Sequence, residues 1–388
     1  MKKIFFLANS MNVGGVEKAF LGLLSAIPLD KYEVHLGLIN KKGGFLDYLP
    51  KEVKIHEIAV YQKYWRLIND PPLQYIKEFI LKGNIIDALV HLFLYIQFKL
   101  SGNRYWFYKY LLRNEPMMAE KYDLAVAFAS PFSTIDYYVC EKVNAPIKCG
   151  WIHFDVSKFG IDKGMTSQLY INFQKIFIVS ETAKEIFDSI FPQFKSKTEV
   201  FYNILSPDQV IRLADSGDSF IDNYKGKRIL TVGRISEEKG QRVAIEALKI
   251  LLNKGVDVKW YYVGDGKDRS YCETLAENLG ISDNVVFLGT QTNPYGFMKD
   301  CDLYMQPSRH EGFCITLAEA LCFSKPIVAT NFTGAKEQLQ HRPNGVVTGM
   351  SAEEISEGVI IALEKGQLKN MEKPLLRNDI SKLLNLLQ

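Results

Sequence analysis

The stretch Glu311-Gly312-Phe313-Cys314-Ile315-Thr316-Leu317-Ala318-Glu319 places two carboxylates eight residues apart. The apolar run 315–323 predicts a helix, which should end before Lys325-Pro326. Residues 312–315 then form the start of this helix, where free backbone N–H groups and the helix dipole favour an anion. A phosphate bound there would have one carboxylate toward each end of its molecule, which suits a diphosphate with hydroxyl-bearing groups on both sides. A solvated helix face with two ordinary glutamates would give the same spacing.

A second group of charged residues lies upstream, in the loop Gly233-Arg234-Ile-Ser-Glu-Glu-Lys239-Gly240. The run 228–232 before it has the composition of a strand, and 243–252 after it has apolar residues at helical spacing. Open α/β sheets bind ligands at such loops. The planar fork of Arg234 and the point charge of Lys239 can together neutralise a diphosphate. The alternative is that both cations pair with the two glutamates of their own loop.

These two motifs, Gly-Arg-x4-Lys-Gly at the start of an α/β unit and Glu-x7-Glu later in the chain, resemble those of retaining nucleotide-sugar glycosyltransferases. The specific resemblance is to glycosyltransferase family 4, also called group 1, and it extends over nearly the whole chain. It implies an α/β protein of GT-B architecture, with two Rossmann-like parallel-sheet domains that face each other across a cleft. It also implies that a nucleoside-diphosphate sugar is a substrate and that neither a cofactor nor a metal is needed.

The resemblance assigns roles to the charged residues of both motifs. Arg234 and Lys239 would stabilise the charge that develops on the leaving diphosphate, Glu311 would hold hydroxyls of the donor sugar, and Glu319 would hold the ribose. The residues expected to border phosphate and sugar are Gly312, Phe313, Cys314, Ile315 and Thr316. Many members of the family have a glycine or a proline where this chain has Cys314.

Glycines at the ends of other strands complete the expected donor site. The first strand leads into a loop with Gly14 and Gly15, and the family has a glycine amide here that contacts the donor diphosphate. Gly15 is the preferred contact and Gly14 the second, although a plain left-handed turn would also explain the pair. The loop lacks the G-x-G-x-x-G fingerprint of dinucleotide binding, which argues against a dehydrogenase. The other glycines expected at this site are Gly233, Gly264 and Gly289.

His153 follows the apolar run 147–152 and therefore lies at the carboxyl end of an expected strand. A histidine in such a place is more often structural than functional, but many family members have one here, near the transferred sugar. The resemblance thus implies that His153 lines the site. It need not act as a base, because in a retaining reaction the leaving phosphate can take the acceptor's proton. In the family the nucleotide base lies near the strand that ends before residue 290, and members that select guanine can use a carboxylate there. The segment 290–293 holds none, so the resemblance favours uridine as the base.

Length and composition fit a two-domain enzyme. The chain has 388 residues, more than one hydrophobic core usually supports, with 47% hydrophobic and 23% charged residues. A net charge of +3 does not argue for a nucleic-acid partner. The six cysteines include no C-x-x-C pair and are expected to be reduced thiols of a cytoplasmic protein. The first apolar run is too short for a signal peptide, and no apolar stretch is long enough to span a bilayer.

Strand and helix patterns alternate along the chain, which predicts parallel sheets with crossover helices. The predicted strands are 3–8, 33–39, 54–60, 122–128, 147–152, 176–179 and 199–202 in the first half, and 229–232, 258–263, 285–288, 303–306, 327–329 and 346–348 in the second. With the resemblance, this pattern implies an acceptor-binding domain at 1–205 with an aromatic and basic helical insertion at 61–120, and a donor-binding domain at 206–370. Family members end with a helix that crosses back onto the first domain, and 371–388 is the segment expected to do so here.

The segment 61–110 is rich in aromatic and basic residues. Its most apolar part, 85–100, is interrupted by polar residues, so a membrane span is not expected. One interpretation is an interfacial helix with Trp, Tyr and basic residues at the level of anionic lipid headgroups, which would place the protein on the inner face of the cell membrane. The alternative is a helical pair that packs onto the core of the first domain.

The sequence therefore predicts a metal-independent, retaining glycosyltransferase. It would move a hexose-type sugar, with a UDP-sugar favoured as donor, to a glycan acceptor, such as a lipid-linked intermediate of capsule, exopolysaccharide or O-antigen synthesis. Two alternatives are open at this point. A sugar-nucleotide epimerase of the same architecture would release a free epimer, and a non-catalytic nucleotide-sugar-binding scaffold would only bind.

Overall fold

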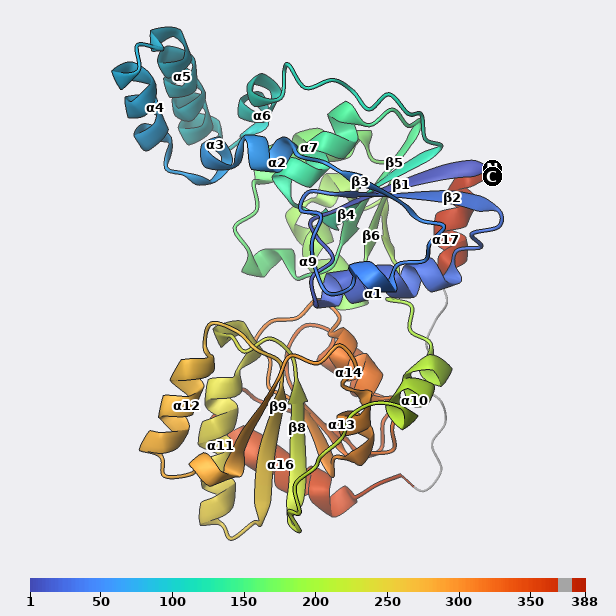
Figure 1. Ribbon diagram of the computed structural model, residues 1–388, viewed down its shortest axis with the longest axis vertical. Helices are drawn as coiled ribbons and strands as arrows, with labels where there is room; N and C mark the ends of the chain where they lie inside the picture. The colour runs from blue at the N-terminus through green and yellow to red at the C-terminus, as the bar shows by residue number, and fades with distance from the viewer. Residues whose placement is uncertain (369–378) are drawn as a thin grey trace. The chain divides into compact units, whose positions relative to one another are not determined.

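The computed structural model describes residues 1–368 and 379–388 (Figure 1). These residues form two compact units. The first comprises Met1–Tyr202 together with the C-terminal residues from 379 on, and the second begins at Asn203. Part of the segment predicted to cross back, 371–378, lies outside the described residues.

The first unit holds a seven-stranded parallel sheet with the strand order β3-β2-β1-β4-β5-β6-β7. Its strands are β1 (Lys2–Ala8), β2 (Tyr32–Leu38), β3 (Lys54–Glu57), β4 (Leu124–Ser130), β5 (Ile147–Ile152), β6 (Lys175–Ile178) and β7 (Thr198–Val200). Its helices are α1 (Gly15–Ala26), α2 (Val60–Lys63), α3 (Trp65–Asn69), α4 (Pro72–Leu81), α5 (Ile85–Ser101), α6 (Tyr105–Leu111), α7 (Ser133–Lys142), α8 (Lys163–Leu169), α9 (Glu181–Ile190) and α17 (Ile380–Leu384).

Alternate residues of these strands point to opposite faces of the sheet, and both faces are covered. Ala125 and Ala127 of β4 belong to a core cluster that includes residues of α6, α7, α8 and α9. The neighbouring residue Phe128 faces the other way, where its ring lies 5.1 Å from that of Phe20 on α1. Burial on both faces explains why the strands read as continuous apolar runs in the sequence.

The C-terminal helix α17 belongs to the first unit, although it follows the second unit in the chain. Leu383 and Leu387 are buried. The carboxylate of Asp379 accepts a hydrogen bond from the N–H of Tyr202 (3.2 Å), and the ammonium of Lys382 donates to the carbonyl of Val200 (2.7 Å). The C-terminal residues therefore pack at the end of β7, the last strand of the first unit.

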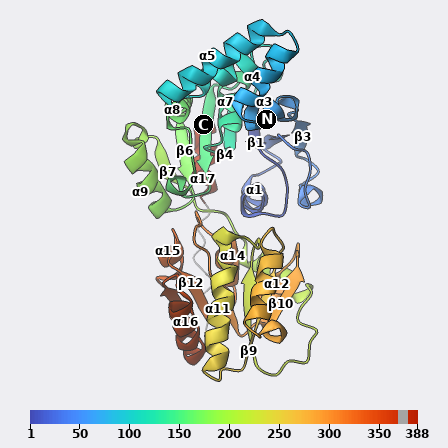
Figure 2. The same ribbon diagram turned by 90° about the vertical axis from the view of Figure 1, so that its left-hand side faces the viewer.

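Helices α4 and α5 form a hairpin that extends away from the sheet of the first unit (Figures 1 and 2). The hairpin has a small core of its own, made by Tyr75, Ile76 and Ala88. By contrast, residues of α6 belong to the main core cluster. The alternative considered above, packing onto the core of the first domain, thus describes α6, whereas α4 and α5 pack chiefly on each other. Within the described part of the chain, no helix is long and apolar enough to cross a membrane.

The second unit holds a six-stranded parallel sheet with the order β10-β9-β8-β11-β12-β13. Its strands are β8 (Lys227–Val232), β9 (Val258–Val263), β10 (Val285–Gly289), β11 (Leu303–Gln306), β12 (Ile327–Thr330) and β13 (Gly345–Thr348). Its helices are α10 (Pro207–Asp215), α11 (Gln241–Asn253), α12 (Arg269–Asn278), α13 (Tyr295–Asp300), α14 (Ile315–Ala320), α15 (Ala335–Leu339) and α16 (Ala352–Lys365).

In this sheet too, alternate residues of each strand point to opposite faces. Residues such as Leu230 and Tyr261 join a cluster with α10, α13, α14 and α15, whereas Ile229 and Trp260 join one with α11, α12 and α16. Each strand predicted from the sequence is present, with ends that shift by a few residues. The largest shift is at the end of β3, because α2 begins at Val60, where the pattern predicted strand.

Candidate active site

Three glycines meet at the carboxyl ends of β8, β9 and β10. The N–H of Gly233 donates to the carbonyl of Val263 (2.9 Å), and the N–H of Gly264 donates to that of Gly289 (2.8 Å). A β-carbon at position 264 would lie 2.0 Å from the carbonyl oxygen of Gly233, so the backbones can approach only because this residue is glycine. Nothing lies within 4 Å of where a β-carbon would stand at Gly233 or Gly289. This edge of the sheet therefore offers open space next to the backbone.

Arg234 follows these glycines and is exposed. Its carbonyl accepts a hydrogen bond from Nε2 of Gln241 (2.8 Å), which fixes the loop to the first turn of α11. Among residues 1–368 and 379–388, no carboxylate forms an ion pair with its guanidinium. The charge is thus available to a ligand.

Lys239 does not pair with the glutamates of its own loop. Its ammonium lies 2.5 Å from Oε1 of Glu311, and the hydroxyl of Ser308 donates to the same oxygen (2.7 Å). The side chains of Lys239 and Glu311 are only 24% and 11% exposed. Burial alone would lower the pKa of Lys239, but the charge of Glu311 and its hydrogen bond outweigh burial, and the pKa is raised. Lys239 is therefore a protonated cation at neutral pH.

Glu311 is held by polar residues that follow β11. Nε2 of Gln306 donates to the hydroxyl of Ser308 (2.8 Å), and the hydroxyl of Tyr304 donates to Oε1 of Gln306 (2.7 Å). The sequence analysis did not single out Gln306 or Ser308. The sequence nevertheless indicated a role for them, because both are polar residues at the end of an apolar strand and buried polar groups are normally hydrogen-bonded.

The segment from Glu311 to α14 makes a tight turn at Cys314. This residue has φ 61° and ψ 79°, and it is the one non-glycine residue with positive φ in the described ranges. That backbone region strongly favours glycine, which explains why the family often has glycine at this place. Cys314 is buried, its sulfur lies 3.5 Å from the hydroxyl of Thr316, and burial raises the pKa of its thiol.

The predicted helix after this turn is shorter than expected, because α14 ends at Ala320 rather than at Phe323. Gly312 and Phe313 are buried, whereas Ile315 and Thr316 are partly exposed. The hydroxyl of Thr316 donates to Oε1 of Gln306 (3.2 Å), which connects the start of α14 to the network under Glu311. The side chains of the predicted phosphate-binding segment are thus fixed by their own contacts.

Glu319 lies on α14 and is fully buried. Its Oε1 accepts a hydrogen bond from the hydroxyl of Tyr295 on α13 (2.8 Å). Burial and the neighbouring carboxylate raise the pKa of Tyr295, so the phenol keeps its proton. The two glutamates of the motif therefore differ in environment: Glu311 pairs with a cation, and Glu319 is held by a phenol.

The expected residues of the first unit lie at the carboxyl ends of its own strands. Gly14 is the N-cap of α1, with φ −161°, and Gly15 is the first residue of that helix. Neither backbone is left-handed, and nothing lies within 4 Å of a β-carbon placed at Gly15. Neither the conformation nor the protein packing requires glycine at position 15, so the left-handed turn considered above does not explain the pair.

His153 follows β5 and is stacked among aromatic rings, with its ring centre 4.6 Å from that of Phe128. Burial lowers its pKa to about 3, partly offset by a hydrogen bond to the backbone of Phe128. The imidazole is therefore neutral at pH 7. Its Nε2 is buried and has no hydrogen-bond partner among the described residues. The nitrogen that meets the backbone is then Nδ1, which leaves Nε2 as an unused acceptor.

The chain also contains an Asp-x-Asp sequence, Asp300-Cys301-Asp302, of the kind that can carry a metal-bound diphosphate. Here both carboxylates have structural partners. Asp300 accepts from the hydroxyl of Ser219 (2.5 Å), and Asp302 accepts from the N–H of Arg228 (2.9 Å) and the ammonium of Lys227 (3.0 Å). Asp302 precedes β11, at the opposite end of the sheet from Arg234. The motif is therefore not part of the candidate site.

Comparison with known proteins places this site in a family. Residues 219–375 match the family described as Glycosyl transferases group 1. This part of the chain is similar to group 1 glycosyltransferases. The match covers Arg234, Lys239 and both glutamates of the Glu-x7-Glu motif, and the predicted resemblance to group 1 glycosyltransferases is confirmed.

Two relatives and one solved structure extend the comparison. An uncharacterised glycosyltransferase of Methanocaldococcus jannaschii is 29% identical over 168 residues, which is 42% of this chain and 41% of that one. The N-acetylgalactosamine-N,N'-diacetylbacillosaminyl-diphospho-undecaprenol 4-alpha-N-acetylgalactosaminyltransferase of Campylobacter jejuni is 25% identical over 380 residues, 96% of this chain and 93% of that one. The crystal structure of Anabaena HepE in complex with UDP-glucose has a TM-score of 0.64 at 18% identity and covers 99% of this chain and 100% of that one. The GT-B fold is thus confirmed.

Proposed function

We propose that this protein transfers a hexose-type sugar from a nucleoside-diphosphate sugar to a lipid-linked glycan, with retention of configuration and without a metal or cofactor. The observation that carries the proposal is the cationic pair at the end of β8. Arg234 is exposed without an ion-pair partner among the described residues, and Lys239 is a protonated cation held 2.5 Å from Glu311. Both lie within the residues that match the group 1 family.

The two cations supply the charge that a leaving diphosphate needs. As the bond from the sugar to the phosphate breaks, negative charge grows on the phosphate oxygens, and fixed positive groups beside them lower the barrier. Ion pairing fixes the position of Lys239 before the donor binds, so little reorganisation is needed. Because protein cations take this role, the reaction as proposed needs no divalent ion, and the partners of Asp300 and Asp302 agree with this.

Glu311 would position both the cation and the donor. Its Oε1 already accepts from Lys239 and Ser308, so its Oε2 is the oxygen proposed to accept from a hydroxyl of the donor sugar. Glu319 is proposed to hold the ribose. Glu319 is fully buried, and the hydrogen bond from Tyr295 to its Oε1 fixes the side chain on α14.

His153 is proposed to accept a hydrogen bond from the donor sugar rather than to act as a base. Its pKa near 3 makes it a very weak base, and its Nε2 is the free acceptor described above. A sugar hydroxyl can donate to that nitrogen. The acceptor's proton would then go to the leaving phosphate, as the retaining mechanism allows.

A uridine nucleotide is the proposed donor base. The residues after β10, Thr290 to Asn293, offer no carboxylate to the N1–H and amino group of guanine. Anabaena HepE, a protein of the same fold, has been crystallised with UDP-glucose. Both observations support a UDP-sugar.

The acceptor is proposed to be carried on a lipid at the inner face of the membrane. The relative from C. jejuni that matches nearly the whole chain is named for a diphospho-undecaprenol acceptor. In this chain, one face of α5 carries exposed apolar residues at helical spacing. They are Ile86 (77% exposed), Leu89 (62%), Phe93 (67%), Ile96 (48%) and Leu100 (84%). An amphipathic helix that exposes such a stripe beside basic residues suits an anionic membrane surface.

Not every basic residue of this region is free to meet lipid. The guanidinium of Arg104 donates to the carbonyl of Ile68 (3.2 Å) and lies 5.0 Å from the ring centre of Phe107, so it packs inside the insertion. Lys99 is exposed at the end of α5. The membrane contact is therefore assigned to the apolar stripe and to lysines such as Lys99.

Sedimentation with vesicles tests this contact. The variant Leu89→Ser/Phe93→Ser/Ile96→Ser should bind anionic vesicles at least tenfold more weakly than wild type, and Lys99→Gln should weaken binding mainly at low salt. The control is Ile221→Ser, which removes a 99% exposed apolar residue of the second unit and should change nothing. Equal sedimentation of all variants, or of wild type with neutral and anionic vesicles, would remove the membrane from the proposal.

A panel of nucleotide sugars with a lipid-linked acceptor tests the enzyme assignment. Transfer to the acceptor, in the presence of a chelator, is the expected result. Release of a free epimer would instead identify an epimerase, and binding without turnover would identify a scaffold. The panel needs no assumption about the sugar, which the site residues do not define.

A further inference from the structure

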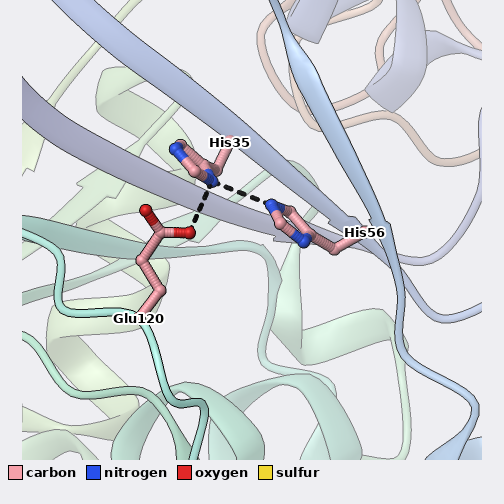
Figure 3. A group of neighbouring side chains, drawn as sticks. All are labelled: His35, His56 and Glu120. Carbon is pink, nitrogen blue, oxygen red and sulfur yellow. Dashed lines mark hydrogen bonds and ion pairs between the residues drawn. The ribbon is translucent and has the colours of Figure 1, made fainter.

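A cluster of polar side chains that the donor site does not use lies on the first sheet. Figure 3 shows His35 of β2, His56 of β3 and Glu120, which precedes β4. Nδ1 of His35 lies 2.8 Å from Nε2 of His56 and 3.5 Å from Oε2 of Glu120. His35 is fully buried, whereas His56 and Glu120 are partly exposed. His35 is the middle residue of β2 and pairs in register with Lys54, the first residue of β3, and Glu120 lies on the amino-terminal side of β4. The carboxyl ends of the strands carry Gly15 and His153.

The hydrogen bonds of His35 define its tautomer. Its Nε2 lies 2.8 Å from Oε1 of Glu33, and that oxygen also accepts from the ammonium of Lys54 (2.5 Å). Because the ammonium of Lys54 donates to the same Oε1, Glu33 is the acceptor in both contacts. Nε2 of His35 must therefore carry a proton. In the neutral ring, Nδ1 is then a bare acceptor that points at His56 and Glu120. A carboxylate behind a histidine is the usual support of a metal-binding imidazole.

We propose that His35 Nδ1, His56 Nε2 and Glu120 Oε2 bind a divalent cation of the zinc class. Two imidazoles and one carboxylate are ligands that zinc prefers over magnesium or calcium, which take oxygen ligands. The three ligand atoms lie within 4.8 Å of one another. A fourth position would be filled by water, because His56 and Glu120 reach the surface.

The geometry needs only a small change to accept the ion. Ligands about 2.0–2.1 Å from a tetrahedral zinc ion lie roughly 3.3 Å apart. The 3.5 Å between His35 and Glu120 already agrees with this, and the 2.8 Å between His35 and His56 must open by roughly 0.5 Å. His56 lies on β3, the edge strand of the sheet, so its ring has room to move.

Charge balance sets the expected strength of binding. Lys3 lies 2.5 Å from Oε1 of Glu120, and Lys54 lies 2.5 Å from Glu33, so two lysines offset the two carboxylates. Binding should therefore be weaker than at a four-ligand structural zinc site, with a Kd on the order of micromolar. The ion would connect edge strand β3 and the segment before β4 to the buried His35. Its role is to stabilise the first unit, independently of glycosyl transfer.

Metal titration tests the proposal. After treatment with a chelator and dialysis, the protein is titrated with ZnCl2 against a chromophoric competitor, and with MgCl2 as the contrasting ion. Wild type should bind one zinc ion per chain, bind magnesium far more weakly, and melt several degrees higher when zinc is saturating. Cobalt(II) at the same site should give the visible absorption bands of tetrahedral coordination.

Variants assign the ligands. His56→Ala should weaken zinc binding at least 100-fold, and Glu120→Gln should also weaken it. Glu33→Gln should weaken it about 10- to 100-fold while the cobalt spectrum stays tetrahedral, because Glu33 only orients His35. The control is His341→Ala, which removes an exposed histidine of the second unit and should leave binding unchanged. Absence of a saturable zinc site in wild type, or equal binding by His56→Ala, would overturn the proposal and leave a hydrogen-bonded histidine pair.

Discussion

Substitutions at the ion pair between Lys239 and Glu311 distinguish a loss of catalysis from a loss of stability. Lys239→Ala removes a cation from the proposed leaving-group site and leaves Glu311 with the hydroxyl of Ser308. Loss of one stabilising donor of this kind typically costs 10²- to 10³-fold in kcat, or about 3–4 kcal/mol. Breaking a fully buried pair costs about 3–5 kcal/mol and an exposed one at most about 1. With side chains 24% and 11% exposed, an intermediate loss of about 2 kcal/mol is expected. That loss lowers the Tm by about 4–8 °C.

Two further variants make the reasoning testable. Arg234→Ala should lose a similar factor in transfer but change the Tm by no more than about 2 °C, because its side chain is exposed without an ion pair in the described chain. The double variant Lys239→Ala/Glu311→Gln should recover about half of the lost stability, since no uncompensated carboxylate remains, yet it should recover no transfer. Initial rates and thermal unfolding of the four proteins provide the data. A wild-type rate in Lys239→Ala, or recovery of transfer in the double variant, would refute the leaving-group assignment.

Three other predictions follow from single features. His153 has a folded pKa of about 3, below its ordinary value of 6.5, so its contribution to stability is complete above pH 6.5 and is lost as the pH falls toward 3. Wild type should therefore lose about 2 kcal/mol more than His153→Gln between pH 6.5 and 5 in urea unfolding, and an equal loss would contradict the burial argument. Cys314→Val should lower the free energy of unfolding by about 2–3 kcal/mol, because a β-branched residue is strained at φ 61°. Cys314→Gly should change it by no more than about 1 kcal/mol. Equal stability of both variants would argue against the strained turn. Deletion of residues 379–388 uncovers the apolar surface that Leu383 and Leu387 bury and should destabilise the first unit by about 3 kcal/mol or more. Calorimetry measures this loss, and an unchanged unfolding transition would show that α17 does not support the fold.

Much of the fold could be predicted because both sheets are buried on both faces. Strands such as β5 and β9 read as short apolar runs with no competing pattern, and their predicted ends agree with the structure. The end of β3 was misjudged because Val60 is a buried apolar residue that continues the run, although it belongs to α2. The short length of α14 was also missed. Cys322 and Phe323 are buried, so apolar periodicity continues beyond the helix end.

The charged residues of the candidate site were identified from spacing, but their partners were not. The sequence offered Lys239 two nearby glutamates, and the structure instead pairs it with Glu311, because the loop after β8 and the segment after β11 lie side by side. The N–H of Arg309 donates to the carbonyl of Glu238 (2.8 Å) and holds the two segments together. A contact of this kind depends on strand order, with β8 next to β11, which local sequence does not encode.

The zinc-class cluster was missed for a similar reason. His35 and His56 stand far apart in the sequence and meet only because β2 and β3 pair in register. Glu120 belongs to the segment before β4, which is two strands away from β2 in the sheet order. Neither the spacing of the ligands nor their residue types suggested a site before the sheet was known.

The central claim is transfer of a sugar from a nucleoside diphosphate by the cations at the end of β8. The most direct measurement is the anomeric configuration of the product, determined by NMR after incubation of the protein with a UDP-sugar, a lipid-linked acceptor and a chelator. The account predicts a glycosidic product with the anomeric configuration of the donor, and its loss by at least 100-fold in Arg234→Ala. An inverted product, a strict requirement for a divalent ion, or undiminished transfer by Arg234→Ala would contradict it.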